Sequence, residues 1–384
     1  MTTENSKPLK GILVVDFSQF LSGPSAGLRL ADLGARVIKI ERPSGGDICR
    51  DLYISNLELD GDSTLFHSIN RNKESFSADL KNENDVIIVK KILTKADVII
   101  QNFRPEAMKR LGFHYEEVRK LNPEIIYAEI TGYGKEGPWK NMPGQDLLVQ
   151  AVSGLPWLNG DAGQPPIPFG LAVADMAAGE HLVQGILACL VRRGITGKGG
   201  HVEVSLLESI LDFQFELFTT YLNDNKQLPE RSKINNANTY LDAPYGIYET
   251  LDGYIALAMG SIPQLGKIIG CEELENSFSA SANRDTLKKI IADHLKTKKS
   301  AEWIEMLEQA NYWSAEVLNW DRLKKHEGFQ VLDMIQHVTR DNGTELLTTR
   351  CPIRIGGRLF KSAKASPRIG ENQEEILEEV EDTK

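Results

Sequence analysis

The stretch GILVVDFSQFLSGPSAGLRLADLGARVIKIE, residues 11–41, decides the fold class of this chain. Its first part, residues 11–17, is a short β-branched apolar run, which predicts a buried strand. Pro24 then opens a helix and Gly34 ends it, because proline suits the first turn of a helix and glycine a position just past its end. Residues 36–41 predict a second strand. This strand–helix–strand order is typical of a parallel sheet.

The same alternation continues along the chain. Residues 96–100 and 124–130 predict further strands, with helical segments between them. Residues 175–193 predict one long apolar helix, and residues 201–205 predict a strand that is followed by helix to about residue 221. We therefore expect an α/β fold with a large domain built on a Rossmann-like parallel sheet.

A polar stretch at residues 223–235 is the best candidate for a linker. We expect a large domain at 1–222, a smaller α+β domain at 236–339, and a C-terminal segment at 340–384 that returns to the large domain. Within the smaller domain, residues 248–258 predict a hairpin, since a Leu-Asp-Gly turn divides two strand-like runs.

Composition excludes several classes of protein. The formal net charge of −10 over 384 residues argues against binding to nucleic acid or to an anionic membrane surface. Four widely spaced cysteines and seven scattered histidines indicate reduced thiols and no metal site. The chain begins without an apolar leader and has no apolar stretch long enough to cross a bilayer, so we expect a cytoplasmic protein.

Two short motifs suggest other chemistry, and their context argues against both. Residues 132–137, GYGKEG, match the dinucleotide pattern, which needs a helix to begin there, whereas Pro138 and Pro143 favour a loop. Residues 23–27, GPSAG, match the hydrolase elbow, which needs its serine on a sharp turn directly after a strand. Ser25 instead falls in the expected first helix, so a serine hydrolase stays an unfavoured alternative.

Four basic residues lie near the ends of predicted strands: Arg42, Lys73, Arg104 and Arg110. Ligands of open α/β sheets bind outside the carboxyl ends of the strands. Individually these residues read as solvated surface charges. Together they could form the basic pocket that an acidic chain needs for a phosphorylated ligand.

Ordered blocks of sequence run along nearly the whole chain. They include residues 16–24, 30–43, 46–50, 70–73, 101–105, 110–112, 121–134, 151–154, 174–179, 193–199 and 366–371. These blocks resemble the class III CoA-transferases (CaiB/BaiF type), the family of formyl-CoA:oxalate CoA-transferase, carnitine CoA-transferase and α-methylacyl-CoA racemase. The resemblance implies an acyl-CoA:carboxylate CoA-transferase whose substrates are acyl-CoA and a small carboxylic acid.

The resemblance implies a nucleophilic aspartate at Asp175. From the residues alone, Asp175 reads as the N-cap of the long helix, a position where the helix dipole also keeps a carboxylate ionised. In the implied reaction the carboxylate attacks the thioester to give a mixed anhydride, and the released CoA then forms an aspartyl-CoA thioester. Thioester is exchanged for thioester, which agrees with the absence of an ATP-binding P-loop motif from the sequence.

By the same matching, CoA contacts fall on residues that follow the predicted strands. They are Gln19, Phe20, Leu21, Arg42, Lys73, Asn102, Phe103, Arg104 and Arg110. The basic side chains suit the phosphates of CoA. Phe103 could stack on adenine, Asn102 could hydrogen-bond the nucleotide or pantetheine portion, and simple core packing remains an alternative role for Phe20 and Leu21.

The chain departs from the racemases of this family at Gln145, where they carry a catalytic histidine. Glutamine cannot act as a general base, so Gln145 points to transfer instead of racemisation. Asp146 is expected beside Asp175, and the loop at Gly260 is poorer in glycine than that of oxalate-using members. The likeness to dicarboxylate-using members of the family implies succinyl-CoA as donor and a dicarboxylic acid as acceptor. A 2-methylacyl-CoA racemase and a non-catalytic acyl-CoA-binding protein remain alternatives.

The family resemblance also carries expectations about assembly. It implies that linkers join the two lobes so that the monomer is an open ring. Two such rings interlock as a homodimer, with the active site between lobes.

Overall fold

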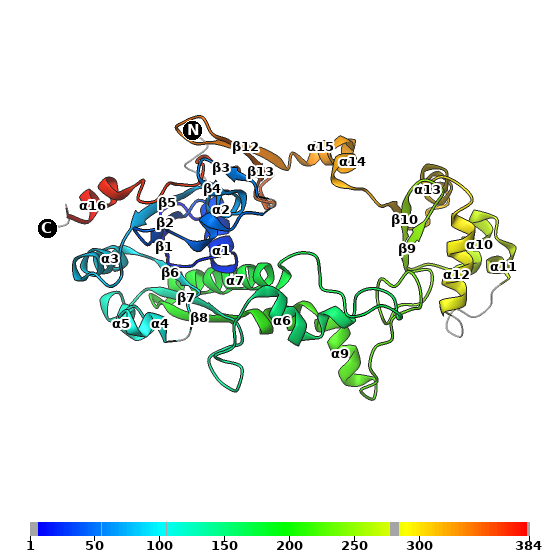
Figure 1. Cartoon of the computed structure of the whole chain (residues 1–384), viewed down its shortest axis with the longest axis horizontal. Coiled ribbons are helices and arrows are strands. Elements are labelled where there is room, and N and C mark those ends of the chain that lie inside the picture. The colour runs from blue at the N-terminus through cyan, green and yellow to red at the C-terminus, as the bar shows by residue number, and fades with distance from the viewer. Residues whose placement is uncertain (1–6, 55, 105, 277–283, 382–384) are drawn as a thin grey trace. The chain divides into compact units, whose positions relative to one another are not determined.

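The computed structural model describes most of the chain (Figure 1). The described residues are 7–54, 56–104, 106–276 and 284–381. They form two compact units that interleave along the sequence. The first unit takes in the chain up to residue 149, residues 172–213 and the chain from residue 332; the second takes in residues 150–171 and 214–331. The domain boundaries expected from the sequence stay a prediction.

The first unit is built on a six-stranded sheet in which all neighbouring strands are parallel. In spatial order the strands are β5 (Lys73–Ser77), β2 (Arg36–Glu41), β1 (Leu13–Asp16), β6 (Val98–Gln101), β7 (Ile126–Thr131) and β8 (Gly200–Ser205). Counted along the chain this order is 3-2-1-4-5-6, so the direction of winding reverses between β1 and β6. The expected α/β fold with a parallel sheet is confirmed.

Helices cover both faces of this sheet (Figure 1). On one face α1 (Ser22–Asp32) packs against α7 (Val173–Thr196), which also contacts β7 and β8. On the other face α3 (Glu83–Lys95), α5 (Tyr115–Leu121) and α16 (Gln373–Glu381) bury apolar side chains against the strands. Each large apolar side chain that is fully buried in this core contributes about 1.5–3 kcal/mol.

Strand β5 is not predicted from the sequence, because Lys-Glu-Ser-Phe-Ser contains a single large apolar residue. The strand lies at an edge of the sheet, and the C-terminal segment covers that edge. Asn372 Oδ1 accepts a hydrogen bond from the Ser75 amide at 3.0 Å, and Gln373 Oε1 accepts one from the Ser77 amide at 2.8 Å. Side chains from almost 300 residues away thus replace the missing neighbouring strand.

The second unit contains a three-stranded antiparallel sheet of β9 (Gly246–Glu249), β10 (Tyr254–Leu257) and β11 (Ser314–Glu316). The predicted hairpin at residues 248–258 is confirmed by the pairing of β9 with β10. Helices α10 (Ile262–Ile269), α12 (Arg284–Leu295) and α13 (Ser300–Gln309) pack on it around the buried Trp303.

The remaining elements are short. The helices are η2 (Ile48–Asp51), α2 (Thr64–Asn70), α4 (Ala107–Arg110), α6 (Asp146–Ser153), η3 (Leu155–Trp157), α8 (Leu206–Phe213), α9 (Phe215–Asn223), α11 (Glu272–Glu275), α14 (Trp320–Lys325) and α15 (Glu327–Leu332). The strands are β3 (Glu58–Leu59), β4 (Asp62–Ser63), β12 (Ile335–Thr339), β13 (Glu345–Thr349), β14 (Arg354–Ile355) and β15 (Arg358–Leu359). Within the described residues, no helix is both long enough and apolar enough to cross a membrane.

Candidate active site

The loops that follow β1 and β6 meet where the winding of the sheet reverses. Asn102, just after β6, accepts a hydrogen bond from the Gln19 amide at 2.8 Å and donates one to the Gln19 carbonyl at 2.7 Å. Phe20 has a φ of +63°, which is uncommon for a residue with a side chain, and its amide donates to Asp47 Oδ1 at 3.2 Å. Three of the expected CoA contacts, Gln19, Phe20 and Asn102, therefore come together at the edge where such sheets bind ligands.

Leu21 and Phe103, also expected to contact CoA, both take part in packing. Leu21 is the N-cap residue of α1 and packs against the cluster of Cys49, Phe66 and Ile69. The Phe103 ring packs against the core of the sheet. Phe20, by contrast, exposes 44% of its surface. Packing is thus part of the role of Leu21 and Phe103, while Phe20 faces solvent.

Three expected cationic residues lie exposed after the carboxyl ends of strands. Arg42 follows β2, and its guanidinium donates to the Gly46 carbonyl at 3.2 Å. Arg104 follows β6, and Arg110 is the last residue of α4. All three side chains therefore have surface on which to meet an anion.

Lys73, the fourth expected cation, lies in the interior. Its ammonium donates to Asp16, to the Pro24 carbonyl and to Asn70, each at 2.9 Å. Burial lowers the pKa of Lys73 to about 8, and attraction to Asp16 opposes that change. All three N–H donors are engaged by the protein, and the side chain has no exposed surface for a phosphate.

Lys73 belongs to a buried charge network beneath the loop after β1. We define this charge network as Asp16, Lys39, Glu41, Asp47, Arg50 and Lys73. Lys39 pairs with Asp47 at 2.7 Å and donates to the Ser18 carbonyl at the same distance. Arg50 holds both carboxylate oxygens of Glu41. Since each buried charge faces an opposite one, the network can fix the backbone that carries Gln19.

Asp175 is the third residue of α7, and the N-cap position belongs to Ala172. The N-cap role read from the sequence is therefore wrong for Asp175. Asp146, the first residue of α6, performs it from a distant part of the chain, since its Oδ1 accepts from the amides of Ala174 at 2.7 Å and Asp175 at 3.2 Å. The amide donors of the first turn of a helix need such acceptors.

The environment of Asp175 raises its basicity. Burial raises the pKa of the Asp175 carboxyl to about 6, and the negative charge of Asp146 adds to the rise. A hydrogen bond from the Ser22 hydroxyl acts in the opposite direction. The carboxylate is consequently mostly ionised at pH 7 while being a stronger base than an ordinary aspartate.

Gly179 lets α7 approach α1 closely. A Cβ atom at this position would lie 2.4 Å from Ser25 Oγ and 2.8 Å from the Ser22 carbonyl oxygen. The hydroxyl of Ser25 donates to that same carbonyl at 2.7 Å from within α1. Ser25 thus sits inside a helix and not on a strand-to-helix turn, so the geometry of a hydrolase elbow is not met. Ser22, which the sequence motifs do not single out, is the residue that reaches Asp175.

The residues before α6 are held by a contact between two glycines. A Cβ atom on Gly132 would lie 2.7 Å from the Gly144 Cα, so the loop from 132 to 144 begins and ends at one place. The dinucleotide-like motif lies in this loop, and no helix begins within it. Gln145 is exposed directly after the glycine contact, and Asp146 follows it into α6.

Gly260 belongs to the second unit, between β10 and α10. A Cβ atom there would lie 2.5 Å from the Tyr312 hydroxyl oxygen, which donates a hydrogen bond to the Ser261 carbonyl at 3.2 Å. Close packing against Tyr312 is therefore one reason for glycine at this position.

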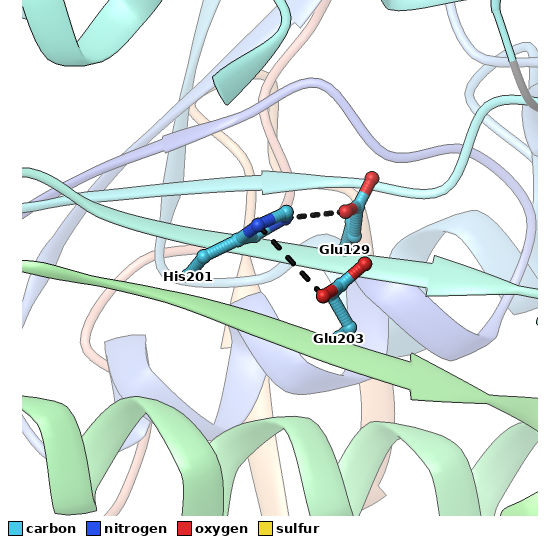
Figure 2. A group of neighbouring side chains, drawn as sticks. All are labelled: Glu129, His201 and Glu203. Atoms are coloured by element: carbon cyan, nitrogen blue, oxygen red, sulfur yellow. Dashed lines mark hydrogen bonds and ion pairs between the residues drawn. The ribbon is translucent and has the colours of Figure 1, made fainter. Parts of the chain in front are cut away.

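A second polar cluster in the first unit consists of Glu129, His201 and Glu203, whose side chains converge in Figure 2. It lies on the sheet face away from α7, because Val202, which alternates with these residues, contacts α7 at Gly185. His201 Nε2 lies 2.5 Å from Glu129 Oε1. Their ligand atoms are close enough for a metal ion, but the Lys135 ammonium pairs with both glutamates and already supplies the cation.

Glu129 and His201 of this cluster line a cavity of about 310 Å³, together with Phe103 and Arg104. The His201 ring stacks on Tyr115 with centroids 4.4 Å apart. Among the described residues, no hydrogen bond or ion pair joins this cluster to Asp175, so the cluster is separate from the candidate active site.

Comparison with known proteins gives one consistent result. The sequence profile of CoA-transferase family III matches residues 9–373. Succinate–glutarate CoA-transferase of Agrobacterium fabrum is 30% identical, and the alignment covers 97% of this chain and 96% of that protein. Acetyl-CoA:oxalate CoA-transferase of Acetobacter aceti is 35% identical over 79% of each chain.

The fold agrees with the solved structures of this family. A CaiB/BaiF family protein from Brucella suis superposes with a TM-score of 0.85 at 29% identity, covering 97% of this chain and 99% of that one. Rv3272 from Mycobacterium tuberculosis superposes with a TM-score of 0.83 at 28% identity, covering 97% and 99%. Sequence and fold together show that this chain belongs to CoA-transferase family III, the CaiB/BaiF family of enzymes that act on acyl-CoA.

Proposed function

We propose that this chain moves CoA from succinyl-CoA to a free dicarboxylic acid, with Asp175 as the nucleophile. Relatives from Agrobacterium fabrum, mouse and Haloarcula hispanica carry names that pair succinate or succinyl-CoA with glutarate or mesaconate. The relative from Acetobacter aceti is named for acetyl-CoA and oxalate. Relatives named for a succinyl donor and a relative named for formyl-CoA and oxalate all align over almost the full length of this chain, so the preference for a succinyl donor rests on the number of relatives whose names contain it.

The observation that carries the proposal is the setting of Asp175. Its carboxyl lies in the first turn of α7, close to the first residue of α1, and its pKa is about 6. Two helix N-termini favour negative charge at this point, while burial and Asp146 keep the carboxylate basic. A carboxylate that is both ionised and basic is suited to attack on a thioester carbonyl.

The proposed reaction keeps the number of thioester bonds constant. An Asp175 oxygen bonds to the acyl carbon of the donor, and the C–S bond breaks to release CoA thiolate. The thiolate attacks the Asp175 carboxyl carbon, which forms an aspartyl-CoA thioester and expels the donor acid as a carboxylate. The acceptor carboxylate attacks this thioester, releasing CoA thiolate again, and the thiolate takes the acceptor acyl group from the anhydride. Asp175 returns to its free carboxylate.

We propose that CoA binds along the carboxyl edge of the sheet, at the loops after β1, β2 and β6. Gln19 and Phe20 would contact the ligand from the loop after β1, where the winding of the sheet reverses. The charge network and Asn102 hold the backbone of this loop in place through their hydrogen bonds. Arg42, Arg104 and Arg110 would supply the charges that meet the phosphates. Lys73 acts beneath the surface as a part of the charge network.

The quaternary structure and location implied by the family complete the proposal. We propose a cytoplasmic homodimer of interlocked rings, in which the second unit of one chain and its loop at Gly260 help to enclose the reacting groups. Light scattering on the purified protein tests the dimer directly, because a monomer of 42.8 kDa and a dimer differ twofold in mass.

A racemase would need a base at Gln145, and the exposed glutamine there cannot accept a proton from carbon. The test is mass spectrometry of the protein with succinyl-CoA, acetyl-CoA or formyl-CoA and a panel of free acids. A new acyl-CoA at constant total thioester, strongest with succinyl-CoA and a dicarboxylate, is the expected result. Deuterium at Cα without acyl exchange would instead identify an isomerase, and tight acyl-CoA binding without exchange would identify a binding protein.

A further inference from the structure

Three polar side chains lie side by side near the carboxyl ends of β6, β7 and β8. Gln101 is paired in register with Glu129, and Glu129 with Glu203, so all three lie on the same face of the sheet. Two acids in neighbouring positions repel each other unless a cation holds them. The Lys135 ammonium pairs with both glutamates, and His201 bonds Glu129 as well (Figure 2). The row is therefore centred on one carboxylate, that of Glu129.

The Glu129 carboxylate determines which way the Gln101 amide points. Burial would raise the pKa of Glu129, but hydrogen bonds from His201 and Lys135 outweigh it and hold that pKa below the ordinary value. The ionised carboxylate can only accept, and it accepts from Gln101 Nε2 at 2.7 Å. The amide oxygen of Gln101 must then point the other way, where it accepts from the Phe103 amide at 2.8 Å. Since Gln101 exposes only 4% of its surface, these protein groups set its direction.

The Phe103 amide belongs to the loop after β6, at which we propose that CoA binds. Asn102, directly before it, bonds both the amide and the carbonyl of Gln19 in the loop after β1. Arg104 follows directly after it. The hydrogen bond to Gln101 therefore ties this loop to the sheet in the middle of three expected CoA contacts. A rotation of the Phe103 peptide would move Asn102 and Arg104 together.

We propose that Gln101 is a positioning residue for the CoA substrate, acting through the Phe103 amide, and that Glu129 sets its direction. The inference rests on the proposed function, since it concerns a loop at which CoA is expected to bind. Among the described residues, no hydrogen bond or ion pair joins Gln101 or Glu129 to Asp175. Loss of the positioning should therefore weaken binding of the CoA substrate and leave the reaction of the bound substrate nearly unchanged.

The experiment exchanges the two side chains. In Gln101→Glu two carboxylates face each other and the Phe103 amide loses a fixed acceptor, so KM for succinyl-CoA should rise about tenfold. In the double variant Gln101→Glu with Glu129→Gln, the amide at position 129 can donate to the carboxylate at position 101, which still accepts from the Phe103 amide. KM should then return to within about threefold of the wild type, with kcat nearly constant in both variants. A double variant no better than Gln101→Glu would overturn the inference.

The matched control is Glu203→Gln, which removes a charge from the same row. Among the described residues Glu203 pairs with Lys135 and His201 and bonds neither Gln101 nor Phe103. KM for succinyl-CoA should therefore stay within about twofold of the wild type. KM for the acceptor acid should stay constant in every variant. A general disturbance of the fold would raise both KM values alike, and that result would also overturn the inference.

A measurement without turnover separates this inference from the proposed function. Calorimetry gives the Kd for free CoA, and hydrogen exchange followed by mass spectrometry reports on the Phe103 amide. In Gln101→Glu we expect CoA to bind about tenfold more weakly and this amide to exchange faster, and the double variant should reverse both changes.

The wild type decides between the two proposals. Equal CoA affinity in the wild type and in Gln101→Glu would overturn the positioning role even in a protein that transfers CoA. A wild type that binds CoA but transfers no acyl group would reject the proposed reaction, and the affinities would still decide the positioning role. A wild type that binds no CoA would reject both.

Discussion

Asp16 is fully buried and Asp175 is half-buried in the same unit, and their pKa values are shifted in opposite directions. Burial would raise the pKa of Asp16, but Lys73 and Lys39 outweigh it and hold that pKa below the ordinary value. Burial raises the pKa of Asp175 to about 6, and its charged neighbour is another acid, Asp146. Burial acts upward on both pKa values, so the difference between them comes from the neighbours, which are two lysines beside Asp16 and an acid beside Asp175.

The difference separates a structural carboxylate from a reactive one. Asp16 pairs with the Lys73 ammonium and accepts a hydrogen bond from the Ser18 amide. Removing Asp16 would therefore leave these buried groups without this partner. Among the described residues, no cation offsets the charge of Asp175, so this charge is available for chemistry. The two residues can be exchanged for asparagine to test whether stability and turnover divide between them in this way.

The largest effect is expected from Asp175→Asn. We expect kcat for CoA transfer to fall at least about ten-thousandfold, as is typical when a covalent nucleophile is removed. Steady-state assays with the best donor and acceptor measure this loss, and mass spectrometry after trapping with hydroxylamine should lose the Asp175 adduct. Circular dichroism should match the wild type. More than about a tenth of wild-type kcat in the variant would show that Asp175 is not the nucleophile.

The next effect in size is expected in the charge network. Lys73→Met should lower the free energy of unfolding by about 3–5 kcal/mol, because it leaves Asp16 charged and buried without its partner. Urea denaturation measures the loss. The double variant Lys73→Met with Asp16→Asn removes both charges and should recover a large part of it. A loss below about 1 kcal/mol in the single variant would contradict a structural role for this pair.

A smaller effect concerns the stability of Asp175→Asn at different pH values. The folded pKa of about 6 lies above the unfolded value, so ionised Asp175 destabilises the native state. Its stabilising contribution is present below about pH 4 and is lost as the pH rises through 6. At pH 7.5 the variant should therefore be about 1–2 kcal/mol more stable than the wild type, and at pH 4 equal to it. A difference that does not depend on pH would contradict the raised pKa.

The smallest effect is expected from Asp146→Asn. The amide oxygen can still accept from the Ala174 amide, so α7 keeps its cap while the like charge beside Asp175 disappears. The acid limb of the kcat/KM profile should move down by about half a pH unit. An upward movement would mean that Asp146 acts on Asp175 through its hydrogen bonds and not through its charge.

Much of the first unit could be predicted from local sequence. Strands β1, β2, β6 and β7 are rich in apolar residues that signal burial, and β8 shows the alternation of valine with polar residues that is typical of a strand. Strand β5 could not be found in this way, because its polar side chains are buried by ion pairs and by a segment almost 300 residues farther along the chain. Hydrophobic periodicity in the sequence reveals strands that bury apolar side chains. It does not reveal strands whose burial depends on paired charges.

The candidate site shows the same limit. Gln19 and Asn102 could be expected near a ligand because they match the motifs of the family, and the sheet order explains why they meet. Nothing in the local sequence signals that Asp146 caps α7 or that Ser22 reaches Asp175, since both contacts join segments far apart in the chain. Lys73 matches a family motif, and only the three-dimensional contacts reveal that its ammonium is enclosed.

The contact between Gly132 and Gly144 also has a consequence for evolution and engineering. The loop between these residues is a closed excursion, because its two ends touch before the chain enters α6. Its tip can lengthen, shorten or accept a foreign peptide while the register of Asp146 is preserved. A single methyl group at either glycine would instead separate the two ends and displace the carboxylate that caps α7. Variation between related chains should therefore accumulate in the length of this loop and spare its neck.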